Sequence, residues 1–489
     1  MSAPSPVLDL TPDQREQLGR AALDWVLDWF ARTGTRRLYP HVSADQLEQA
    51  FAERVPREPQ DARAVLAQFA ADVAGGSRDN GHPRMFGYVQ SSGSYVGALA
   101  DFLASALNQN VTSWRSAPAA TTVERRVIDW MKQIVGLPAT ADGVLVSGGS
   151  MANLVGLAAA TASVHPDVAR RGVRALTGDP VVYASEAVHM SIPKAAAIVG
   201  LGRDSVRRVA VDPDRRMRSD ALDRALEEDR RAGRIPICVV ANAGEVNTGA
   251  IDPVEAIADV CAAHRVWLHA DAAYGGFAAL APSARGALSG LARVDSMSLD
   301  PHKWLFMPVD GGCVLVRDPG TLRRAFSYAA DYVDVVAAAD MSEYAFWDYG
   351  PELTRRFRAL KIWMALKTFG VDAIGRVIER NIQLARRLGE LVDAAPDFER
   401  LAAVPLSIVC FRYTGAMNTA NARDATDPPD LNEVNRALLL RVQRAGHSYL
   451  SNAMIDGRFA LRACVVNHRT GEEDLAALLE EIRRCARVV

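Results

Sequence analysis

Lys303 is the residue of this sequence whose neighbours most directly suggest chemistry. It follows a histidine and precedes a tryptophan in segment 298–304, which reads SLDPHKW. A lysine that attacks an aldehyde must be partly removed from water and needs a flat group beside it. The proline and the small residues predict a turn, and this motif alone fits an ordinary surface turn equally well. Three other segments favour a reactive site.

Segment 143–154 predicts a binding site for a phosphate. A short apolar run ends in the sequence SGGS at 147–150, and alanine and leucine then recur at helical spacing. This pattern predicts a strand, a glycine turn and a helix N-terminus, where backbone N–H groups and the helix dipole favour an anion. Tight connections between a strand and a helix also use glycine for steric reasons alone. The candidate contacts are Gly148, Gly149 and Ser150.

Two further strand ends carry side chains that could hold an aromatic ring. A buried-type strand at 266–269 runs into Asp271, and small residues follow. A carboxylate there can pair with a pyridinium nitrogen and keep it protonated, which makes the ring an electron sink. An aspartate that caps the next turn is about equally common. A strand end at 183 leads to His189, which could stack on the same ring, although a lone histidine is more often structural.

These parts are the ones that pyridoxal 5'-phosphate (PLP) requires. They stand in the chain order phosphate turn, His189, Asp271 and Lys303. This arrangement resembles the PLP-dependent group II decarboxylases, the family of the aromatic L-amino-acid, tyrosine, histidine and glutamate decarboxylases. The resemblance covers residues 80–370.

Three more segments carry the resemblance. Segment 116–124 is similar to the family's SPA-x-T-x-x-E sequence, and segment 353–363 is similar to its RRFR-x-L-K-x-W helix. Phe326, followed six residues later by Tyr332, matches the start of the family's mobile catalytic loop.

The resemblance implies roles for residues of the cofactor site. Lys303 would be the Schiff-base lysine that forms the resting imine with PLP, and Asp271 would hold the pyridine N–H. His189 would lie over the ring face, and Ala273 beneath the ring would leave room for it. Thr354 stands where glycine or serine is usual and would narrow the pocket mouth on the cofactor side. Further contacts with the phosphate, or close to it, are expected from Gly148, Gly149, Ser150, Ser298 and His302.

The resemblance also implies how a substrate is held and which product leaves. Ser91 falls where a hydroxyl residue meets the substrate carboxylate, and Tyr88 and Val89 fall on the wall around the substrate side chain. A tyrosine at the position of Tyr332 protonates the substrate carbon after CO2 is lost and yields an amine. Family members that release an aldehyde and ammonia typically carry phenylalanine there. Tyr332 therefore predicts a carboxy-lyase that converts an L-amino acid, expected to be aromatic, into an amine.

Departures from the family pattern leave the substrate open. Glu245 stands where the family usually has threonine close to the cofactor, and a carboxylate there would repel a substrate carboxylate unless it is protonated, paired or turned away. It could instead recognise a cationic group or redirect the reaction. Asn80 and Gly81 replace a bulky aromatic wall, so an indole or catechol is not assured. The alternatives are an oxidative aldehyde synthase, another PLP enzyme such as one that forms carbon–carbon bonds, and a non-catalytic dimer of the same fold.

Composition and charge argue against several other classes of protein. A net charge of −2 and a pI near 6.5 give no electrostatic reason to expect nucleic acid or an anionic membrane as a partner. The six cysteines are scattered, with no C-x-x-C pair and no histidine cluster, which predicts reduced thiols in the cytoplasm and no metal site. The sequence lacks a basic and apolar leader at its start, and no apolar run reaches the ~20 residues that span a bilayer.

The elements that must position these residues divide the chain into three expected parts. Residues 1–85 predict a helical segment with an apolar stripe from Leu18 to Phe30. The resemblance implies that this segment packs on a second subunit of a homodimer. In residues 86–372, strand-like runs alternate with alanine-rich helical stretches, which predicts an α/β domain with a mostly parallel sheet. Residues 373–489 predict a smaller α+β domain. The family's fold is the aspartate-aminotransferase type, fold type I, and catalytic groups at strand carboxyl ends suit it.

Overall fold

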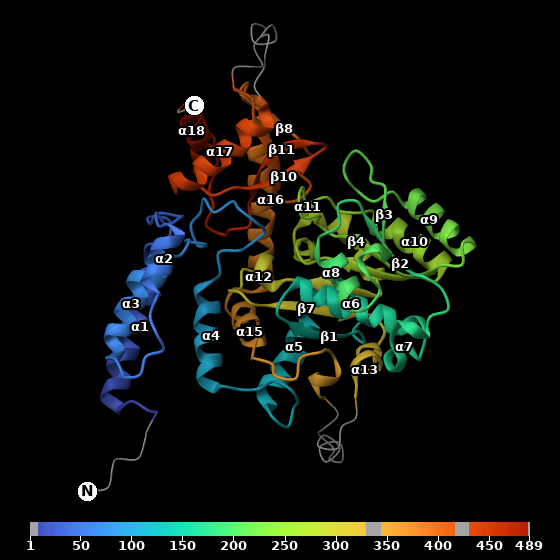
Figure 1. Ribbon diagram of the computed structural model, residues 1–489, viewed down its shortest axis with the longest axis horizontal. Coiled ribbons are helices and arrows are strands. Elements are labelled where there is room, and N and C mark those ends of the chain that lie inside the picture. Colours follow the sequence, from blue (N-terminus) through green and yellow to red (C-terminus); the bar gives the residue numbers. More distant parts are fainter. Residues whose placement is uncertain (1–7, 329–343, 416–429, 488–489) are drawn as a thin grey trace.

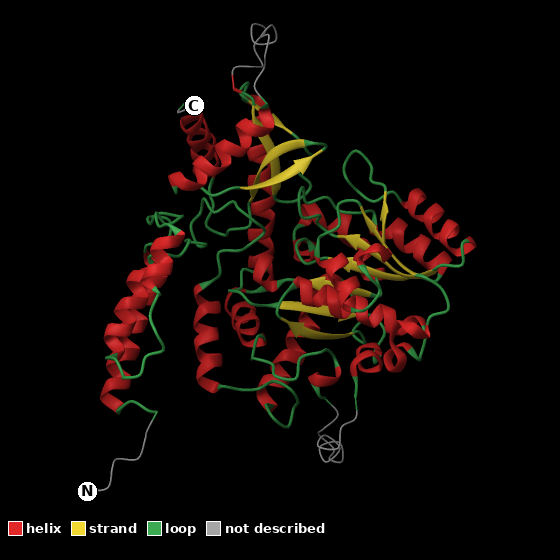
Figure 2. Cartoon of the chain, viewed as in Figure 1, coloured by secondary structure: helices red, strands yellow, loops and turns green. Residues whose placement is uncertain are grey.

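A seven-stranded sheet forms the centre of the chain (Figures 1 and 2). The computed structural model describes residues 8–328, 344–415 and 430–487. The strands are β1 (Asp142–Val146), β2 (Pro180–Ser185), β3 (Val206–Val209), β4 (Ile235–Asn242), β5 (Trp267–Asp271), β6 (Ser296–Leu299) and β7 (Gly312–Val316). Their order in the sheet is β1-β7-β6-β5-β4-β2-β3. Strands β2 to β6 run parallel and β7 is antiparallel to both neighbours, so the mostly parallel sheet of fold type I is confirmed.

Helices cover both faces of this sheet, which explains why its strands are short apolar runs. In β4, Val239 and Ala241 join one apolar cluster while Cys238 and Val240 join another, as expected from the alternation of side chains along a strand. The helices of this region are α5 (Pro118–Val135), α6 (Gly149–Val164), α7 (Val168–Arg171), α8 (Ser191–Ile198), α9 (Ser219–Arg231), α10 (Val254–His264), α11 (Pro282–Arg285), α12 (Pro301–Trp304) and α13 (Thr321–Phe326). Helix α6 packs on β4, β5, β6 and β7, which places it over the centre of the sheet.

Short helical turns complete the layer around the sheet. They are η2 (Gly172–Ala175), η3 (Arg203–Ser205), η4 (Gly276–Leu280), η5 (Gly286–Arg293) and η6 (Phe346–Asp348). None of the helices in the described ranges combines the length and the apolar character needed to cross a membrane.

A second, four-stranded antiparallel sheet lies in the C-terminal part, as the α+β pattern predicts. Its order is β10-β11-β9-β8, with β8 (Phe398–Arg400), β9 (Ile408–Tyr413), β10 (Ser451–Ile455) and β11 (Arg458–Cys464). The helices here are α16 (Val371–Ala394), α17 (Leu431–Ala445) and α18 (Glu472–Ala486), whereas α15 (Ala359–Phe369) packs on α5 in the region of the large sheet. Helix α16 contacts η4 at one end and β8 and β9 at the other, so it joins the two sheets. The domain boundaries at residues 85 and 372 stay predictions.

The N-terminal helices stand at one edge of the molecule, away from both sheets (Figure 1). They are α1 (Pro12–Ala31), α2 (Ala44–Ala50), α3 (Ala62–Gln68) and η1 (Phe69–Ala74), and α4 (Tyr95–Leu107) follows. Thr11 caps α1 and exchanges hydrogen bonds with Gln14, which explains where the helix begins. No residue of α1 is buried within this single chain, and Leu23 and Leu27 are each 47% exposed. Trp25 packs edge-on against Phe69, and Phe30 packs edge-on against Tyr95. Within the described residues, the exposed large apolar side chains of α1 are therefore Leu23 and Leu27.

Candidate active site

A cavity of about 440 Å³ opens where the parallel strands of the large sheet end. Its lining comes from the turn between β1 and α6, from the segments after β2, β4 and β5, and from α12. Residues from distant parts of the sequence thus meet at one edge of the sheet, as is usual for open α/β sheets. Of the residues predicted from the sequence, those that line this cavity are Tyr88, Val89, Gly148, Gly149, Ser150, His189, Asp271, Ala273, His302 and Lys303.

The glycine turn brings the start of α6 close to the end of β5. A Cβ atom on Gly149 would lie 2.8 Å from the Cβ of Ala273 and 2.8 Å from Oδ2 of Asp300. Only glycine allows this approach. No described side chain caps the N-terminus of α6, so the N–H groups of its first turn remain available at the cavity. This is an arrangement that binds an anion.

Asp271 sits at the end of β5 and is only 8% exposed. Its Oδ2 accepts a hydrogen bond from Nδ2 of Asn153 at 2.9 Å. Its Oδ1 accepts from Oγ of Ser298 at 3.1 Å and from the backbone N–H of Ala273 at 3.3 Å. Three donors therefore stabilise the negative charge. Ser298, predicted to lie near a phosphate, is fully buried and supports Asp271 instead.

His189 follows β2 and faces the same cavity. Its Nδ1 accepts the backbone N–H of Ser191 at 3.2 Å and lies 2.8 Å from Oγ of the same serine. Burial lowers the pKa of His189, while the charge of Asp271 opposes this effect and that of Lys303 adds to it. The imidazole is therefore neutral near pH 7 with its hydrogen on Nε2, and it can lie flat against a ring.

Lys303 stands in the short helix α12 and is held by an acidic partner that the sequence did not predict. Its Nζ lies 2.9 Å from Oδ2 of Asp300, whose side chain is almost fully buried. The other oxygen, Oδ1, accepts no hydrogen bond from any residue within the described ranges. The turn is fixed from behind because the fully buried Trp304 stacks on Tyr274, with ring centroids 4.8 Å apart.

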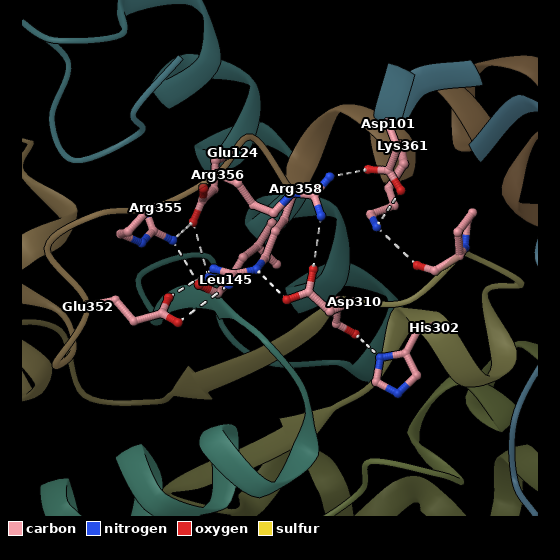
Figure 3. A network of polar contacts seen from close by, with 12 residues as sticks. Asp101, Glu124, Leu145, His302, Asp310, Glu352, Arg355, Arg356, Arg358 and Lys361 are labelled. Carbon is pink, nitrogen blue, oxygen red and sulfur yellow. Dashed lines mark hydrogen bonds and ion pairs between the residues drawn. The ribbon is translucent and has the colours of Figure 1, made fainter. Parts of the chain in front are cut away.

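A network of charged groups holds the segment that follows Lys303 (Figure 3). The Arg358 guanidinium pairs with Glu352 at 2.9 Å and with Asp310 at 3.2 Å. The carbonyl of Gly311, next to Asp310, accepts a hydrogen bond from Nδ1 of His302 at 2.7 Å. This bond assigns the hydrogen of His302 to Nδ1 and leaves Nε2 toward the cavity side, 3.7 Å from the Asp300 carboxylate.

The same network contains a buried ion pair between Arg355 and Glu124 (Figure 3). These residues come from segments 353–363 and 116–124, the two segments with family-like motifs. Both partners bind the backbone of Leu145 in β1: Glu124 accepts from its N–H at 3.1 Å, and Arg355 donates to its carbonyl at 2.8 Å. Burial raises the pKa of Glu124, and the Arg355 guanidinium opposes this effect. The pair thus clamps β1 just before the glycine turn.

Four predicted site residues do not face the cavity in the described structure. Ser91 is buried, and its hydroxyl donates to the His302 carbonyl at 2.9 Å, so it supports the Lys303 turn rather than meeting a substrate. Ser298 supports Asp271, as described above. Thr354 is exposed and does not line the cavity, so it cannot narrow its mouth within this chain. The fourth residue is Glu245, whose carboxylate binds residues of its own loop. Tyr332 lies outside the described residues.

Glu245 is turned away from the cavity although its neighbours Gly244 and Val246 line it. Its Oε1 accepts from N and Nδ2 of Asn247 at 2.7 and 2.6 Å. Its Oε2 accepts from N and Oγ1 of Thr248 at 2.8 and 2.9 Å. The carboxylate is therefore used to close a local turn, and the prediction of a substrate contact is corrected.

Arg462 lines the cavity from β11, in the second sheet, and was not predicted from the sequence. The residue is buried. Its Nε donates to the carbonyl of Asn247 at 3.2 Å, its Nη1 donates to Oγ of Ser451 at 3.0 Å, and its Nη2 donates to the carbonyl of Val246. One N–H on each terminal nitrogen remains for an anion in the cavity. A charged residue within the apolar strand sequence FALRACVV was a signal that could have revealed it.

The groups around the cavity fit PLP part by part. The uncapped first turn of α6 suits the phosphate, and Gly149 leaves the space that a Cβ would fill. Asp271 presents a buried carboxylate suited to a pyridine N–H, and the neutral His189 suits a ring face. Lys303 provides an amine for the aldehyde, and Asp300 balances its charge beside the phosphate site.

Comparisons with known proteins agree with PLP as the cofactor. The conserved domain of pyridoxal-dependent decarboxylases matches residues 44–414. An aromatic-L-amino-acid decarboxylase from Bacillus atrophaeus is 34% identical over 483 residues, covering 99% of this chain and 97% of the relative. A phenylacetaldehyde synthase from Petunia hybrida is 29% identical over 469 residues, covering 93% and 91%. The crystal structure of Oryza sativa TDC with PLP and tryptamine gives a TM-score of 0.89 at 28% identity and covers 99% of both chains.

Proposed function

Because this chain belongs to the family of pyridoxal-dependent decarboxylases, we propose that it converts an aromatic L-amino acid into the corresponding amine and CO2. PLP is its cofactor. The observation that supports the proposal most directly is that Lys303, Asp271 and His189 face one cavity beside the open N-terminus of α6. The aromatic side chain of the substrate is inferred from the aromatic-L-amino-acid decarboxylase of Bacillus atrophaeus. The match to that protein covers 99% of this chain.

Each residue of the site has a distinct task in this proposal. When bound, the cofactor supplies an electron sink for the pair of electrons that stays on the substrate carbon as CO2 leaves. Asp271 holds a proton on the ring nitrogen, and His189 lies against the ring. Lys303 provides the amine that binds the aldehyde carbon, and the Asp300 carboxylate stabilises that amine whenever it is free and protonated.

Arg462 is the group we assign to the substrate carboxylate. The bond to the departing CO2 must stand perpendicular to the cofactor ring, and a fixed cation at the side of the cavity imposes that orientation. Arg462 is fixed by its three hydrogen bonds to backbone and serine oxygens and retains free N–H groups. Ser91 cannot serve in this way because its hydroxyl hydrogen is used within the Lys303 turn.

Tyr332 is the proposed donor of the proton that replaces CO2. A competing outcome is oxidative release of an aldehyde, and the 29% identity with the Petunia hybrida aldehyde synthase is the observation that favours it. The tyrosine argues for the amine. In Tyr332→Phe only the hydroxyl is lost, so we expect CO2 release to continue while amine formation gives way to oxidation by dissolved O2, which with water yields aldehyde, ammonia and H2O2. An unchanged amine yield in this variant would remove Tyr332 from the donor role.

The experiment that tests the proposed function is a screen of the standard L-amino acids for CO2 release, with identification of the organic product. We expect CO2 and amine in equal amounts from one or more aromatic amino acids, with no H2O2. Release of aldehyde and H2O2 by the wild type would favour the oxidative reaction. A protein that binds PLP yet releases no CO2 from any amino acid would contradict both reactions.

The functional unit is proposed to be a homodimer. Leu23 and Leu27 of α1 are about half exposed in the single chain, and Phe102 of α4 is also exposed. Obligate subunit interfaces of this kind bury more than ~2,000 Å² in total. Light scattering should therefore show a dimer, and Leu23→Asp combined with Leu27→Asp should weaken it. A wild-type monomer that is active at nanomolar concentration would contradict the proposal.

A further inference from the structure

Strand β5 carries a series of polar groups toward Asp271. Trp267, His269 and Asp271 alternate along the strand and share one of its faces. The parallel register with β6 sets His269 opposite Ser296 and Asp271 opposite Ser298. Both pairs are bonded, with Nδ1 of His269 2.8 Å from the Ser296 hydroxyl and Oδ1 of Asp271 3.1 Å from that of Ser298. The register alone therefore aligns these groups.

A continuous run of hydrogen bonds leads from Trp267 to Asp271. Nε1–H of Trp267 donates to the Ser296 hydroxyl at 2.8 Å. Oδ1 of Asn153 carries no hydrogen, so Nε2–H of His269 must donate to it across 3.0 Å. Nδ1 of the neutral ring then accepts from Ser296. Nδ2 of Asn153 in turn donates to Oδ2 of Asp271 at 2.9 Å. Every donor in the run points toward the carboxylate.

His269 is suited to this place because it is neutral. Complete burial lowers the pKa of His269 to about 4, and the charge of Asp271 opposes this only in part. At neutral pH the ring therefore carries one hydrogen, and its contacts assign that hydrogen to Nε2. A Cβ atom on Gly156 would lie 2.6 Å from Cε1 of the His269 ring. Glycine at this point of α6 provides the space for the imidazole.

Asn153 also connects Asp271 with His189, through the hydroxyl of Ser191. Its amide donates to the Ser191 hydroxyl at 2.8 Å, and that hydroxyl lies 2.8 Å from Nδ1 of His189. One buried amide thus contacts the Asp271 carboxylate directly and the His189 imidazole through one serine. Neither Asn153 nor His269 was assigned a function from the sequence.

We propose that His269 and Asn153 are positioning residues, which fix the orientation and the charge of Asp271 and hold His189 in the same frame. The proposal rests on the proposed function, in which Asp271 keeps the cofactor's ring nitrogen protonated. Without a donor at His269, Oδ1 of Asn153 loses its partner, and only the two hydrogen bonds of Nδ2, to Ser191 and Asp271, hold the amide. The hydrogen bond to Asp271 is then less fixed in direction and is no longer strengthened by the rest of the run.

The two ends of the run set its direction, because the indole of Trp267 can only donate and the carboxylate of Asp271 can only accept. Hydrogen bonds aligned in one direction polarise one another and strengthen the last one. The last one here ends on Asp271, and the same amide of Asn153 also donates to Ser191 beside His189. The observation that supports a positioning role is that the run ends on two groups of the proposed site.

The first test examines His269 in the wild-type holoenzyme. Protein labelled with 15N in histidine should give, for His269, the signals of a neutral imidazole with its hydrogen on Nε2, unchanged down to about pH 5. The signal is assigned by its absence in His269→Gln. An imidazolium at neutral pH, or a hydrogen on Nδ1, would overturn the proposed direction of the run. This result does not depend on activity.

The second test measures the ring nitrogen directly, with holoenzyme reconstituted with PLP labelled with 15N at that atom. His269→Leu removes both hydrogen bonds, whereas His269→Gln keeps a donor at the position of Nε2. We expect a protonated ring nitrogen near pH 8 in the wild type and in His269→Gln, and a partly deprotonated one in His269→Leu. The kcat of His269→Leu should fall about tenfold and that of His269→Gln should stay within about twofold.

Asp271→Asn serves as the reference in this second test, because it removes the charge itself. If His269→Leu matches the wild type while Asp271→Asn has lost the proton, the positioning proposal fails and the role of Asp271 stands. If Asp271→Asn also matches the wild type, the proposed function of Asp271 fails. Equal loss in His269→Leu and His269→Gln would overturn the donor argument. Should His269→Leu not fold, Ser296→Ala tests the same run, with a smaller loss of the ring proton expected.

Discussion

Asp271 is 8% exposed and accepts three hydrogen bonds, whereas Tyr88 is 48% exposed and belongs to a segment outside any helix or strand. The two residues represent two regions of one cavity. We call Lys303, His189 and Asp271 the floor, and Tyr88, Val89 and Arg462 the wall. The floor is positioned by strand ends, the register of β5 with β6 and the start of α6. The wall comes from the segment before α4 and from the second sheet.

The two regions differ in how tightly their side chains are packed, and this decides how much a substitution is expected to disturb each of them. The floor is enclosed by a close-packed core in which a change of one side chain disturbs several partners. Tyr88 and Val89 of the wall lie in a segment outside any helix or strand, so a change there disturbs fewer partners, whereas Arg462 is buried and makes three hydrogen bonds. We therefore expect large effects on activity from substitutions in the floor and smaller effects from substitutions in other regions.

Asp271→Asn is expected to have the largest effect, because it removes the charge at the floor. The fold and PLP binding should persist, since Asn153 and Ser298 still find a partner at this position. The kcat should fall by roughly a thousandfold. Steady-state kinetics together with the absorption of bound PLP checks this. Near-normal turnover with bound cofactor would contradict the role of Asp271.

Arg462→Gln changes the wall and is expected to act mainly on binding. Loss of a charged hydrogen bond to the substrate carboxylate should raise KM by about 10- to 100-fold. Arg462→Lys keeps the positive charge, so its KM should lie between those of the wild type and Arg462→Gln. Kinetics with the preferred amino acid and with its decarboxylated amine as inhibitor separates the carboxylate contact from other losses. Equal weakening of substrate and amine would show that Arg462 acts only on the fold.

Glu245→Gln is expected to affect stability rather than specificity. The amide cannot accept all four hydrogen bonds of the Asn247–Thr248 turn, so unfolding should become easier by about 1–2 kcal/mol. Substrate preference and product should stay the same. Denaturant unfolding and product analysis measure the two effects separately. A changed substrate preference would place Glu245 on the wall after all.

The pKa of His269 predicts an effect on stability that depends on pH. Its pKa is lowered to about 4 in the fold, against an ordinary value of 6.5. The unfolded chain therefore binds more protons between these values, and the stability of the wild type falls as pH decreases through this range. The loss is about 2 kcal/mol at about pH 5. Unfolding of His269→Gln, which has no such group, should change less over the same range, and identical pH profiles would contradict this.

The sequence predicted much of the floor because each of its residues lies next to a strand end within a short, recognisable segment. The glycine turn at 148–149, Asp271 and Lys303 all depend on local structure, and the cavity brings them together. Asp300 and Asn153 stand in the same segments and were missed. A polar amide in an otherwise apolar helix was the available signal for Asn153.

Tyr88 and Val89 of the wall were predicted, whereas the directions of some other side chains and the contribution of Arg462 were not. Alignment with a family motif gives the position of Ser91 and Glu245 in the chain but not the direction of their side chains. Their hydroxyl and carboxylate groups instead bind neighbouring backbone. Arg462 enters from β11, which belongs to another sheet. Its role depends on how the two sheets are arranged, and no spacing within one segment reveals that arrangement.

The central claim is that Lys303 on the floor is the residue that binds PLP, and borohydride reduction of the holoenzyme tests it most directly. Reduction fixes the cofactor to the amine that holds it, and peptide mass spectrometry then identifies the residue. We expect the pyridoxyl label on the peptide that contains Lys303, with Lys303→Ala unlabelled and lacking the visible absorption of the wild type. A label on another lysine, or no label on protein that has bound PLP, would contradict the account.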